Sequence, residues 1–312
     1  MHVALFHPAK LPVRKYGGAD RVVVWLARGL AELGHRVSLL AGSGSDVPEA
    51  TLVPVDISAA SKPGFDLARH LPAGVDLVHA HRPIAAPPGM PLVWTNHGNT
   101  RADQLDRLPP GMICLSANHA ARHQTNSFVY NGLDPAEYRF PSTKGDFDLF
   151  LGRLHTAKGY AWALEGAKRT GHRLVVAGGW RPSLRRDLRY VGEVDDQEKM
   201  TLLSEANCLW MPAQWDEPFG LPLIEAMVSG TPVLGTLKGA LPEVVTPDTG
   251  ALGETLDDLV ALRDRITAID PAACRARVER HFSHRVMAAE YVRFYESTLR
   301  TGNLPAGRVA GM

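Results

Sequence analysis

Short apolar runs alternate with longer stretches of helical periodicity from the first residues onward. An apolar run at 3–7 precedes an amphipathic stretch near 18–33, and a second run covers 36–41. Gly34, between the last two, is a typical helix stop signal. Further short runs follow in the first half, at LVPV (52–55), DLVHAH (76–81), PLVWTN (91–96), MICLS (112–116) and SFVYN (127–131). Because these runs are almost continuously hydrophobic, they favour strands of a parallel sheet that is covered on both faces.

The segment NGLDPAEYRFPSTKGD (131–146) interrupts this alternation with Gly, Pro, Asn and Asp. Asp195 and Glu198 have the spacing of a capping box at the start of a later helix. The alternation restarts after the interruption, with expected strands at 148–152, 173–178, 190–192, 208–213 and 231–235 and expected helices near 158–170, 196–206 and 222–229. Two successive βα arrays predict an α/β protein with two Rossmann-like domains.

The interruption sets the expected domain boundaries, since Pro- and Gly-rich segments are typical of linkers. We expect an N-terminal domain over 1–133, a linker over 134–146, a C-terminal domain over 147–282 and a final helix within 283–312. A chain of 312 residues is long for one core and suits two.

Composition narrows the classes of function. The formal net charge of +1 gives no global field that would attract nucleic acid or an anionic membrane. The N-terminus lacks the pattern of a signal peptide, and no apolar stretch approaches the roughly 20 residues that span a bilayer. Three widely separated cysteines show no metal-ligand spacing. These features predict a protein of a reducing, cytoplasmic compartment without a transmembrane segment.

Two cations follow the first expected strand of the second domain. In LGRLHTAKG, Arg153 leaves the end of the strand and Lys158 stands where the next helix is expected. In an open α/β sheet, ligands bind at the carboxyl ends of the strands. The pair is therefore a candidate diphosphate clamp, and the alternative is two solvated surface charges.

Two carboxylates flank a Pro/Gly-rich stretch in DEPFGLPLIEAM (216–227). Glu217 is expected in a loop, and Glu225 in or near the first turn of the following helix. Backbone N–H groups of Phe219, Gly220 and Leu221 would lie at that helix N-terminus, where anionic oxygen binds well. A carboxylate can accept hydrogen bonds from a vicinal diol, so the acids suit ribose or sugar hydroxyls. The alternative for Glu225 is a favourable interaction with the helix dipole.

The first domain offers two loops at expected strand ends. Tyr16, Gly17 and Gly18 form one of them, where paired glycines allow a close backbone approach to a phosphate or an acceptor. Asn96 and His97 follow PLVWT in the other loop. The alternative for His97 is a purely structural role, which is common for a lone histidine. His79-Ala80-His81 could suggest a metal, but no third ligand has suitable spacing, and structural or acceptor-lining roles are favoured.

Several of these pieces together resemble a known family. EPFGLPLIEAMVSGTPV, with Glu217 and Glu225 eight positions apart, resembles the signature of the retaining glycosyltransferases of family 4. GGADRVV, TNHG, YNGLD, LGRLHTAKG, YVGEV and GALPEVV stand around it in the family's order, from Val3 to about Gly250. The resemblance implies the GT-B fold, in which two Rossmann-like domains face each other across a cleft and the last helix often crosses back to the first domain.

The resemblance also implies roles for individual residues. It implies that Glu225 binds the ribose hydroxyls and that Arg153 and Lys158 bind the diphosphate of a donor sugar nucleotide. Val194, in VGEV (191–194), would lie near the base of the donor. The sugar would contact Glu217 and the backbone of Phe219, Gly220 and Leu221. Gly17 and Gly18 are further implied donor contacts. Tyr16, Asn96 and His97 would line the acceptor side, and His97, Arg153, Lys158 and Glu217 would act in catalysis.

The implied reaction moves a hexosyl group from a UDP- or GDP-type sugar to an acceptor hydroxyl, with retention of configuration and without a metal or other cofactor. The acceptor would be a small molecule, a glycan or a lipid-linked glycan, and no nucleic-acid partner is expected. Two alternatives remain open: an enzyme such as a nucleotide-sugar 2-epimerase or a phosphorylase on the same fold, and a non-catalytic nucleotide-sugar-binding module.

Overall fold

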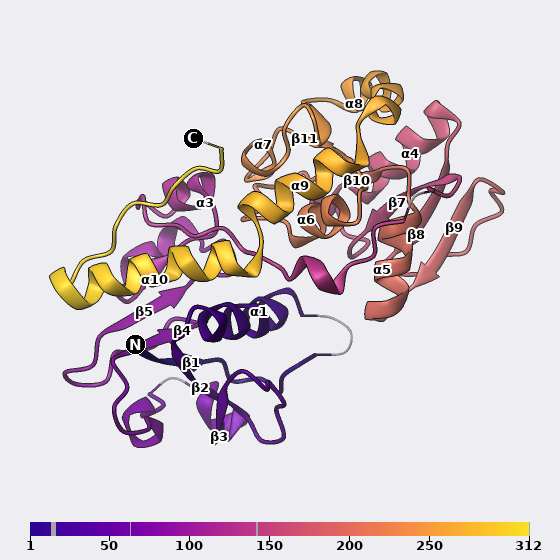
Figure 1. Ribbon diagram of the computed structural model, residues 1–312. Helices are drawn as coiled ribbons and strands as arrows, with labels where there is room; N and C mark the ends of the chain where they lie inside the picture. Colours follow the sequence, from indigo (N-terminus) through magenta and orange to yellow (C-terminus); the bar gives the residue numbers. More distant parts are fainter. Residues whose placement is uncertain (14–16, 63, 142, 312) are drawn as a thin grey trace. The chain divides into compact units, whose positions relative to one another are not determined.

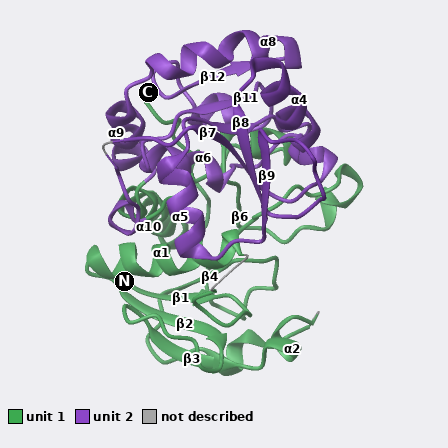
Figure 2. Ribbon diagram, turned by 90° about the vertical axis from the view of Figure 1, so that its right-hand side faces the viewer, with its two compact units in different colours: residues 1–133, 283–312 green, residues 134–282 purple. Residues whose placement is uncertain are grey.

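The computed structural model describes residues 1–13, 17–62, 64–141 and 143–311. The chain divides into two compact units, coloured separately in Figure 2. The first unit combines residues 1–133 with 283–312, and the second comprises residues 134–282. Each unit is described separately below.

The first unit is built on a parallel sheet of six strands in the order β3-β2-β1-β4-β5-β6. The strands are β1 (His2–Phe6), β2 (Arg36–Gly42), β3 (Thr51–Val55), β4 (Leu77–Ala80), β5 (Leu92–Thr95) and β6 (Met112–Ile113). Phe6, Val78 and Trp94 are buried in one core cluster against the sheet, as the near-continuous hydrophobicity of their strands predicts. The run SFVYN was predicted as a strand, but it contributes only an isolated bridge between Phe128 and Cys114.

The helices of the first unit include one from the far end of the chain. They are α1 (Gly18–Glu32), α2 (Ile57–Ala60), α3 (Ala117–Arg122) and α10 (His284–Thr301), with 3-10 turns at Leu67–His70 and Ala102–Arg107. α10 packs on α1 (Figure 1), and a Cβ added at Gly29 would lie 2.6 Å from the carbonyl oxygen of His284. Glu32 accepts from Arg285 at 2.6 Å and lies 3.0 Å from His284 Nε2. The final helix thus completes the first unit.

The second unit repeats the same strand order. Its parallel sheet runs β12-β11-β10-β7-β8-β9. The strands are β7 (Phe147–Leu151), β8 (Arg173–Ala177), β9 (Leu188–Gly192), β10 (Leu209–Met211), β11 (Val233–Thr236) and β12 (Gly250–Gly253). In each sheet the first three strands along the chain form one half and the last three form the other half. The strand order therefore reverses between the two central strands, which is the topological switch point of the sheet. β12 was missed in the sequence, because GALG has few residues that favour strands.

The helices of the second unit lie between these strands and after them. They are α4 (Tyr160–Thr170), α5 (Asp196–Glu205), α6 (Leu221–Val228), α7 (Leu241–Val244), α8 (Leu256–Leu262) and α9 (Pro271–His281), with 3-10 turns at Pro135–Glu137, Thr156–Lys158 and Arg263–Ala268. The predicted capping box of Asp195 and Glu198 is present at the start of α5.

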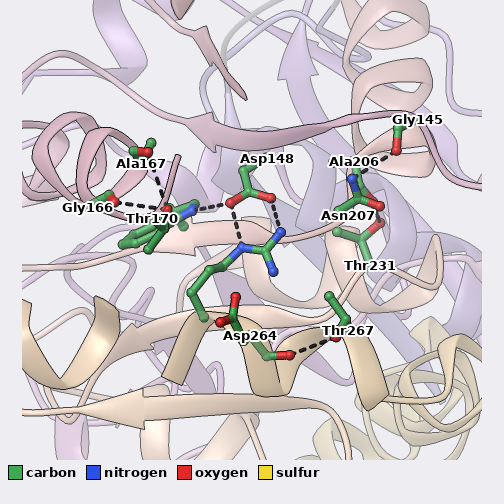
Figure 3. Close-up of polar contacts among 12 residues, drawn as sticks. Gly145, Asp148, Gly166, Ala167, Thr170, Ala206, Asn207, Thr231, Asp264 and Thr267 are labelled. Atoms are coloured by element: carbon green, nitrogen blue, oxygen red, sulfur yellow. Dashed lines mark hydrogen bonds and ion pairs between the residues drawn. The ribbon is translucent and has the colours of Figure 1, made fainter. Parts of the chain in front are cut away.

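The core of the second unit holds a buried ion pair. The carboxylate of Asp148 on β7 accepts from Arg263 Nε at 2.7 Å and Nη2 at 2.6 Å, and from Trp210 Nε1 at 2.8 Å (Figure 3). Arg263 and Asp148 are buried at 1% and 0% exposure. Removal of one partner would leave an uncompensated buried charge, so this carboxylate has a structural role.

The segment predicted as a linker packs on the second unit. Lys144 Nζ donates to the carbonyl oxygens of Ser204 at 2.8 Å and Ser229 at 3.0 Å, and to the hydroxyl of Thr231 at 2.7 Å. Residues 134–146 accordingly cluster with residues 147–282. Among the described residues, no helix is long and apolar enough to cross a membrane.

Candidate functional site

The strongest candidate residues of the second unit follow its two central strands. β7 and β10 are parallel neighbours, so the loops after them leave the same edge of the sheet at the switch point. The loop after β7 carries Arg153 and Lys158, and the loop after β10 carries Glu217. Segments about sixty residues apart in sequence are thereby brought together.

Gly159 lets these two loops approach each other. It adopts a left-handed conformation (φ 70°) between the 3-10 turn that ends at Lys158 and the start of α4. A Cβ at this position would lie 1.7 Å from the carbonyl oxygen of Pro212. The backbone of Gln214 also donates to the carbonyl of Ala157 at 2.8 Å. A glycine is therefore required both by the backbone conformation and by the close contact.

Lys158 and Glu217 form an ion pair at this edge. Lys158 Nζ lies 2.6 Å from Glu217 Oε2, and Trp215 Nε1 donates to the same oxygen at 2.9 Å. The ammonium also stands 5.0 Å from the centre of the Trp215 ring. The side chains of Lys158 and Glu217 remain 25% and 11% exposed. A partly accessible cation and carboxylate, each fixed by neighbours, suit the binding of a polar ligand.

The segment GALPEVV packs against the backbone of Glu217. A Cβ at Gly239 (φ 58°) would lie 2.2 Å from Glu217 N, and Ala240 N donates to Glu217 O at 2.9 Å. Gly239 N also donates to Asp216 Oδ1 at 3.2 Å. This motif thus supports the loop that carries Glu217. Glu243 lies in the first turn of α7.

α6 begins at Leu221, one residue before the predicted start at 222. Gly220, with φ 85°, is its N-cap, and Pro222 stands in its first turn. Phe219 is buried, and its ring centroid lies 5.9 Å from that of Phe282, so its side chain belongs to the core. The first N–H groups of a helix have no partner within the helix and carry its positive dipole end.

Glu225 lies near the first turn of α6, as predicted. It is the fifth residue of the helix, just beyond the first turn, where the effect of the helix dipole is already weaker. Its Oε1 accepts from Lys199 Nζ at 2.6 Å and from Tyr138 OH at 3.0 Å. The residue is 4% exposed. The sequence analysis missed both partners, because they come from α5 and from the segment before β7.

Two further donor candidates lie at strand ends. Arg153 is exposed two residues beyond β7. Val194 is partly buried between the end of β9 and Asp195, the N-cap of α5. Their implied roles stay predictions.

In the first unit, the loop after β1 contains the predicted glycine pair. Tyr16 lies outside the described residues, and Gly18 is the first residue of α1. A Cβ at Gly17 (φ 148°) would lie 2.3 Å from Asp20 Oδ2. Asp20 Oδ1 lies 3.0 Å from His7 Nε2, and this hydrogen bond lowers the pKa of Asp20. The sequence analysis missed His7, whose partner lies across the loop.

His97 belongs to a row of histidines at the carboxyl edge of the first sheet. His97 Nε2 lies 2.9 Å from His81 Nδ1, and the His81 ring stacks on that of His79 with centroids 4.4 Å apart. His79 in turn lies 2.7 Å from Tyr295 OH and 2.8 Å from Thr95 Oγ1. Burial lowers the pKa of His97 and of His79 to about 3, so both are neutral near pH 7.

A second cluster brings together Cys114, His119 and His123, a set that could suit a metal ion. However, His119 accepts from Leu115 N at 3.1 Å and lies 3.0 Å from the carbonyl of Gly98. His123 lies 2.8 Å from the carbonyl of His119, and its Nε2 lies 3.1 Å from Asn96 Nδ2. Burial raises the pKa of Cys114 to about 12, which keeps the thiol protonated. All four ring nitrogens are engaged, so the cluster is structural, and Asn96 is tied to it.

This chain resembles known proteins in both of its halves. The family model "Glycosyl transferases group 1" matches residues 136–269, and "Glycosyltransferase Family 4" matches residues 16–137. The crystal structure of AviGT4, a glycosyltransferase involved in avilamycin A biosynthesis, is 31% identical. The alignment covers 96% of this chain and 98% of AviGT4, with a TM-score of 0.79. The chain belongs to glycosyltransferase family 4.

Characterised relatives of this glycosyltransferase include a phosphatidyl-myo-inositol mannosyltransferase of Propionibacterium freudenreichii subsp. shermanii. It is 27% identical over an alignment of 300 positions, which covers 77% of this chain and 78% of the relative. A glycogen synthase of Mycobacterium tuberculosis is 31% identical over 171 residues, but these span only 41% of the synthase. Sucrose-phosphate synthase of Thermosynechococcus elongatus, with 18% identity over 95% of this chain and 98% of its own and a TM-score of 0.67, shares the GT-B fold.

Proposed function

We propose that this glycosyltransferase moves a hexosyl group from a nucleotide-diphosphate sugar, of the UDP or GDP type, to an acceptor hydroxyl. The transfer retains the configuration at the anomeric carbon and needs no metal ion. The acceptor is a small molecule, a glycan or a lipid-linked glycan. The relatives named as mannosyltransferases support a hexosyl donor.

The observation that carries the proposal is the pair of Lys158 and Glu217 at the switch point of the second sheet. Lys158 offers three donors to a phosphate oxygen, and Glu217 accepts from sugar hydroxyls. The N-terminus of α6 begins four residues after Glu217. A cation, a carboxylate and a helix N-terminus at one sheet edge suit a molecule that carries both a diphosphate and a sugar.

Charge explains how these groups would accelerate transfer. As the bond between the anomeric carbon and the phosphate oxygen breaks, its electron pair stays with the departing diphosphate. Lys158, Arg153 and the dipole of α6 are positive features that can stabilise this charge. Such preorganised groups lower a barrier by about 3–4 kcal/mol each. Side-chain cations in this position can take the part that a divalent ion plays elsewhere.

Donor binding is the first test. Isothermal titration with UDP-, GDP-, dTDP- and ADP-hexoses should identify one nucleotide that binds clearly more tightly than the others. Glu225→Gln should weaken that binding by about 1.5–3 kcal/mol if the carboxylate holds the ribose, the scale of hydrogen bonds to charged groups. Unchanged affinity in the variant would remove Glu225 from the ribose, and absence of binding to all four donors would refute the proposal.

Retention and metal independence are tested on the reaction itself. With the preferred donor, slow release of the free hexose without an acceptor is expected, and the rate should be the same in excess EDTA and in added Mg²⁺ or Mn²⁺. NMR of a product formed with an added glycoside acceptor should show the anomeric configuration of the donor. Inversion, or loss of activity in EDTA that Mg²⁺ restores, would contradict the respective part of the proposal.

A further inference from the structure

A small cavity opens in the first unit, and none of the residues assigned above lines it. Its volume is about 290 Å³, and the side chains that give it chemical character are Lys62, Phe65, Arg82, Ile84 and Pro109. One water takes roughly 30 Å³ of liquid volume, so the cavity could hold about ten waters or a molecule of monosaccharide size. All five residues belong to the first unit.

The cavity lies where an α/β sheet binds its ligands. Arg82 stands two residues beyond β4, which forms the switch point of the first sheet together with β1. Its neighbour in sequence, His81, is in contact with His97. Arg82 thus follows directly after the histidine row in the sequence, at the carboxyl end of β4.

The cavity wall carries positive charge without a matching acid. Among the residues that the structure describes, Lys62 and Arg82 form no ion pair with a carboxylate; Arg82 Nη1 donates to the carbonyl of Ala60 at 3.2 Å. Some other cations of this unit do have acidic partners, such as Arg28 with Glu49 at 2.9 Å. Two unneutralised cations at one cavity favour an anionic ligand.

The remaining wall is apolar and firmly held. The Phe65 ring stacks on Phe6 of β1 with centroids 5.7 Å apart and nearly parallel planes. Ile84 packs against the same core cluster, and the carbonyl of Pro109 accepts from Trp94 Nε1 at 3.1 Å. A preformed apolar wall with a few charged groups is the usual construction of a small-molecule site.

We propose that this cavity binds a phosphate monoester on a small organic body, and that it selects phosphorylated acceptors for the transfer. The role in acceptor selection rests on the proposed function; the binding itself does not. A phosphate monoester carries close to two negative charges at neutral pH, which matches the two cations. Arg82 can bond two phosphate oxygens with its planar guanidinium, while Lys62 adds a point charge. The organic body packs on Phe65 and Ile84.

The test measures binding by isothermal titration with glucose 6-phosphate, glucose and inorganic phosphate. Glucose 6-phosphate should bind, inorganic phosphate should bind more weakly, and glucose should not bind detectably. Lys62→Gln and Arg82→Gln should each raise the Kd of glucose 6-phosphate roughly tenfold or more. Arg107→Gln, an exposed cation of the same unit, is the matched control and should leave the Kd unchanged. Raised salt should weaken the interaction.

A second arm separates the two sources of a phosphate monoester. Vesicles of phosphatidylcholine with and without phosphatidic acid test a lipid headgroup by co-sedimentation. Binding of phosphatidic acid vesicles alone, lost in Lys62→Gln and Arg82→Gln, supports the cavity with a lipid-borne phosphate. Equal affinity for glucose and glucose 6-phosphate, or equal affinity of the variants and the wild type, overturns the proposal. Lys62 is exposed, so its variant stays informative even if Arg82→Gln fails to fold.

Titration of the variants with the nucleotide sugar separates a failure of the cavity assignment from a failure of the proposed function. Both variants should bind the preferred nucleotide sugar as the wild type does. With a phosphorylated acceptor and its unphosphorylated counterpart in hand, transfer rates give a further test. Each variant should have a raised KM for the phosphorylated acceptor and an unchanged KM for the donor. If nucleotide sugars bind and phosphate monoesters do not, only the cavity assignment fails; the reverse result refutes only the proposed transfer.

Discussion

Lys158 and Glu217 come from loops that follow neighbouring strands, and both contact Trp215 in addition to each other. Trp215 donates to the shared oxygen of Glu217 and presents its ring to Lys158. The sequence indicated both residues as candidates through their positions after expected strands. It could not show that they pair, because the pairing depends on β10 lying beside β7, not beside β9, its predecessor in sequence.

Replacement of Lys158 tests the catalytic assignment. Lys158→Ala removes a cation that is 25% exposed, so we expect little change in the melting temperature. Because the variant lacks a fixed charge for the departing diphosphate, kcat for donor turnover should fall roughly 10²-fold or more. Lys168→Ala is the control, since Lys168 lies on α4 with its side chain 66% exposed. Near-wild-type turnover in Lys158→Ala would discard the assignment.

Elements with strong periodicity could be predicted from the sequence, and those defined by distant contacts could not. α1, α5 and α6 begin at or within one residue of their expected starts, because glycine, a capping box and an N-terminal proline mark them. SFVYN is hydrophobic enough for a strand but forms only one bridge to Cys114. Hydrophobicity alone does not provide a neighbouring strand, which tertiary contacts decide.

The family resemblance implied a last helix that crosses back to the first domain, but it did not identify α1 as the element on which α10 packs. Gly29 lies in α1, and its Cα faces the backbone of His284 and the side chain of Ala288. An isolated glycine within a helical pattern costs stability relative to alanine, so its presence there indicates a close approach of another element. The C-terminal helix supplies that element.

Gly29→Val should therefore weaken the first unit. Even a single Cβ would come within 2.6 Å of the His284 carbonyl, so α10 must shift. Overpacking of this kind costs about 1–3 kcal/mol of unfolding free energy. Ala31→Val, at a partly exposed position of the same helix, controls for the lower helix propensity of valine. Urea unfolding followed by circular dichroism measures both; equal midpoints for the two variants would contradict the predicted contact.

At the scale of the whole chain, two units with the same strand order carry different chemistry at their sheet edges. The second unit places a cation and a carboxylate after its central strands, whereas the first places a row of neutral histidines there. The alternation of strand and helix patterns predicted both Rossmann-like arrays, and the family resemblance implied the GT-B fold. Neither pattern showed that His79 and His81 lie beside His97, because the pairing of β4 with β5 brings them together.

Buried histidines make the first unit sensitive to acid. Burial lowers the pKa of His79 to about 3, that of His119 to about 4, and that of His81 well below its ordinary value. In the unfolded chain these groups titrate near 6.5, so below that pH the unfolded state binds more protons than the folded state. Their contribution is therefore fully retained above about pH 6.5 and is lost as the pH falls towards their folded values.

The unfolding free energy should consequently fall between pH 6.5 and pH 5, before most carboxylates titrate. Each such histidine adds a slope that approaches about 1.4 kcal/mol per pH unit. These three and His97, whose pKa is also lowered to about 3, together approach about 5.5 kcal/mol per unit. Urea titrations at several pH values measure the slope, and limited proteolysis with mass spectrometry should locate the first cuts in residues 1–133. His119→Gln should reduce the slope by about a quarter, because it removes one of four such groups. His155→Gln, at an exposed position of the second unit, is the control and should leave the slope unchanged. Because the argument depends on neutral imidazoles held away from water, an unfolding free energy that stays constant from pH 7.5 to 5 would show that these rings are hydrated or charged in the folded protein.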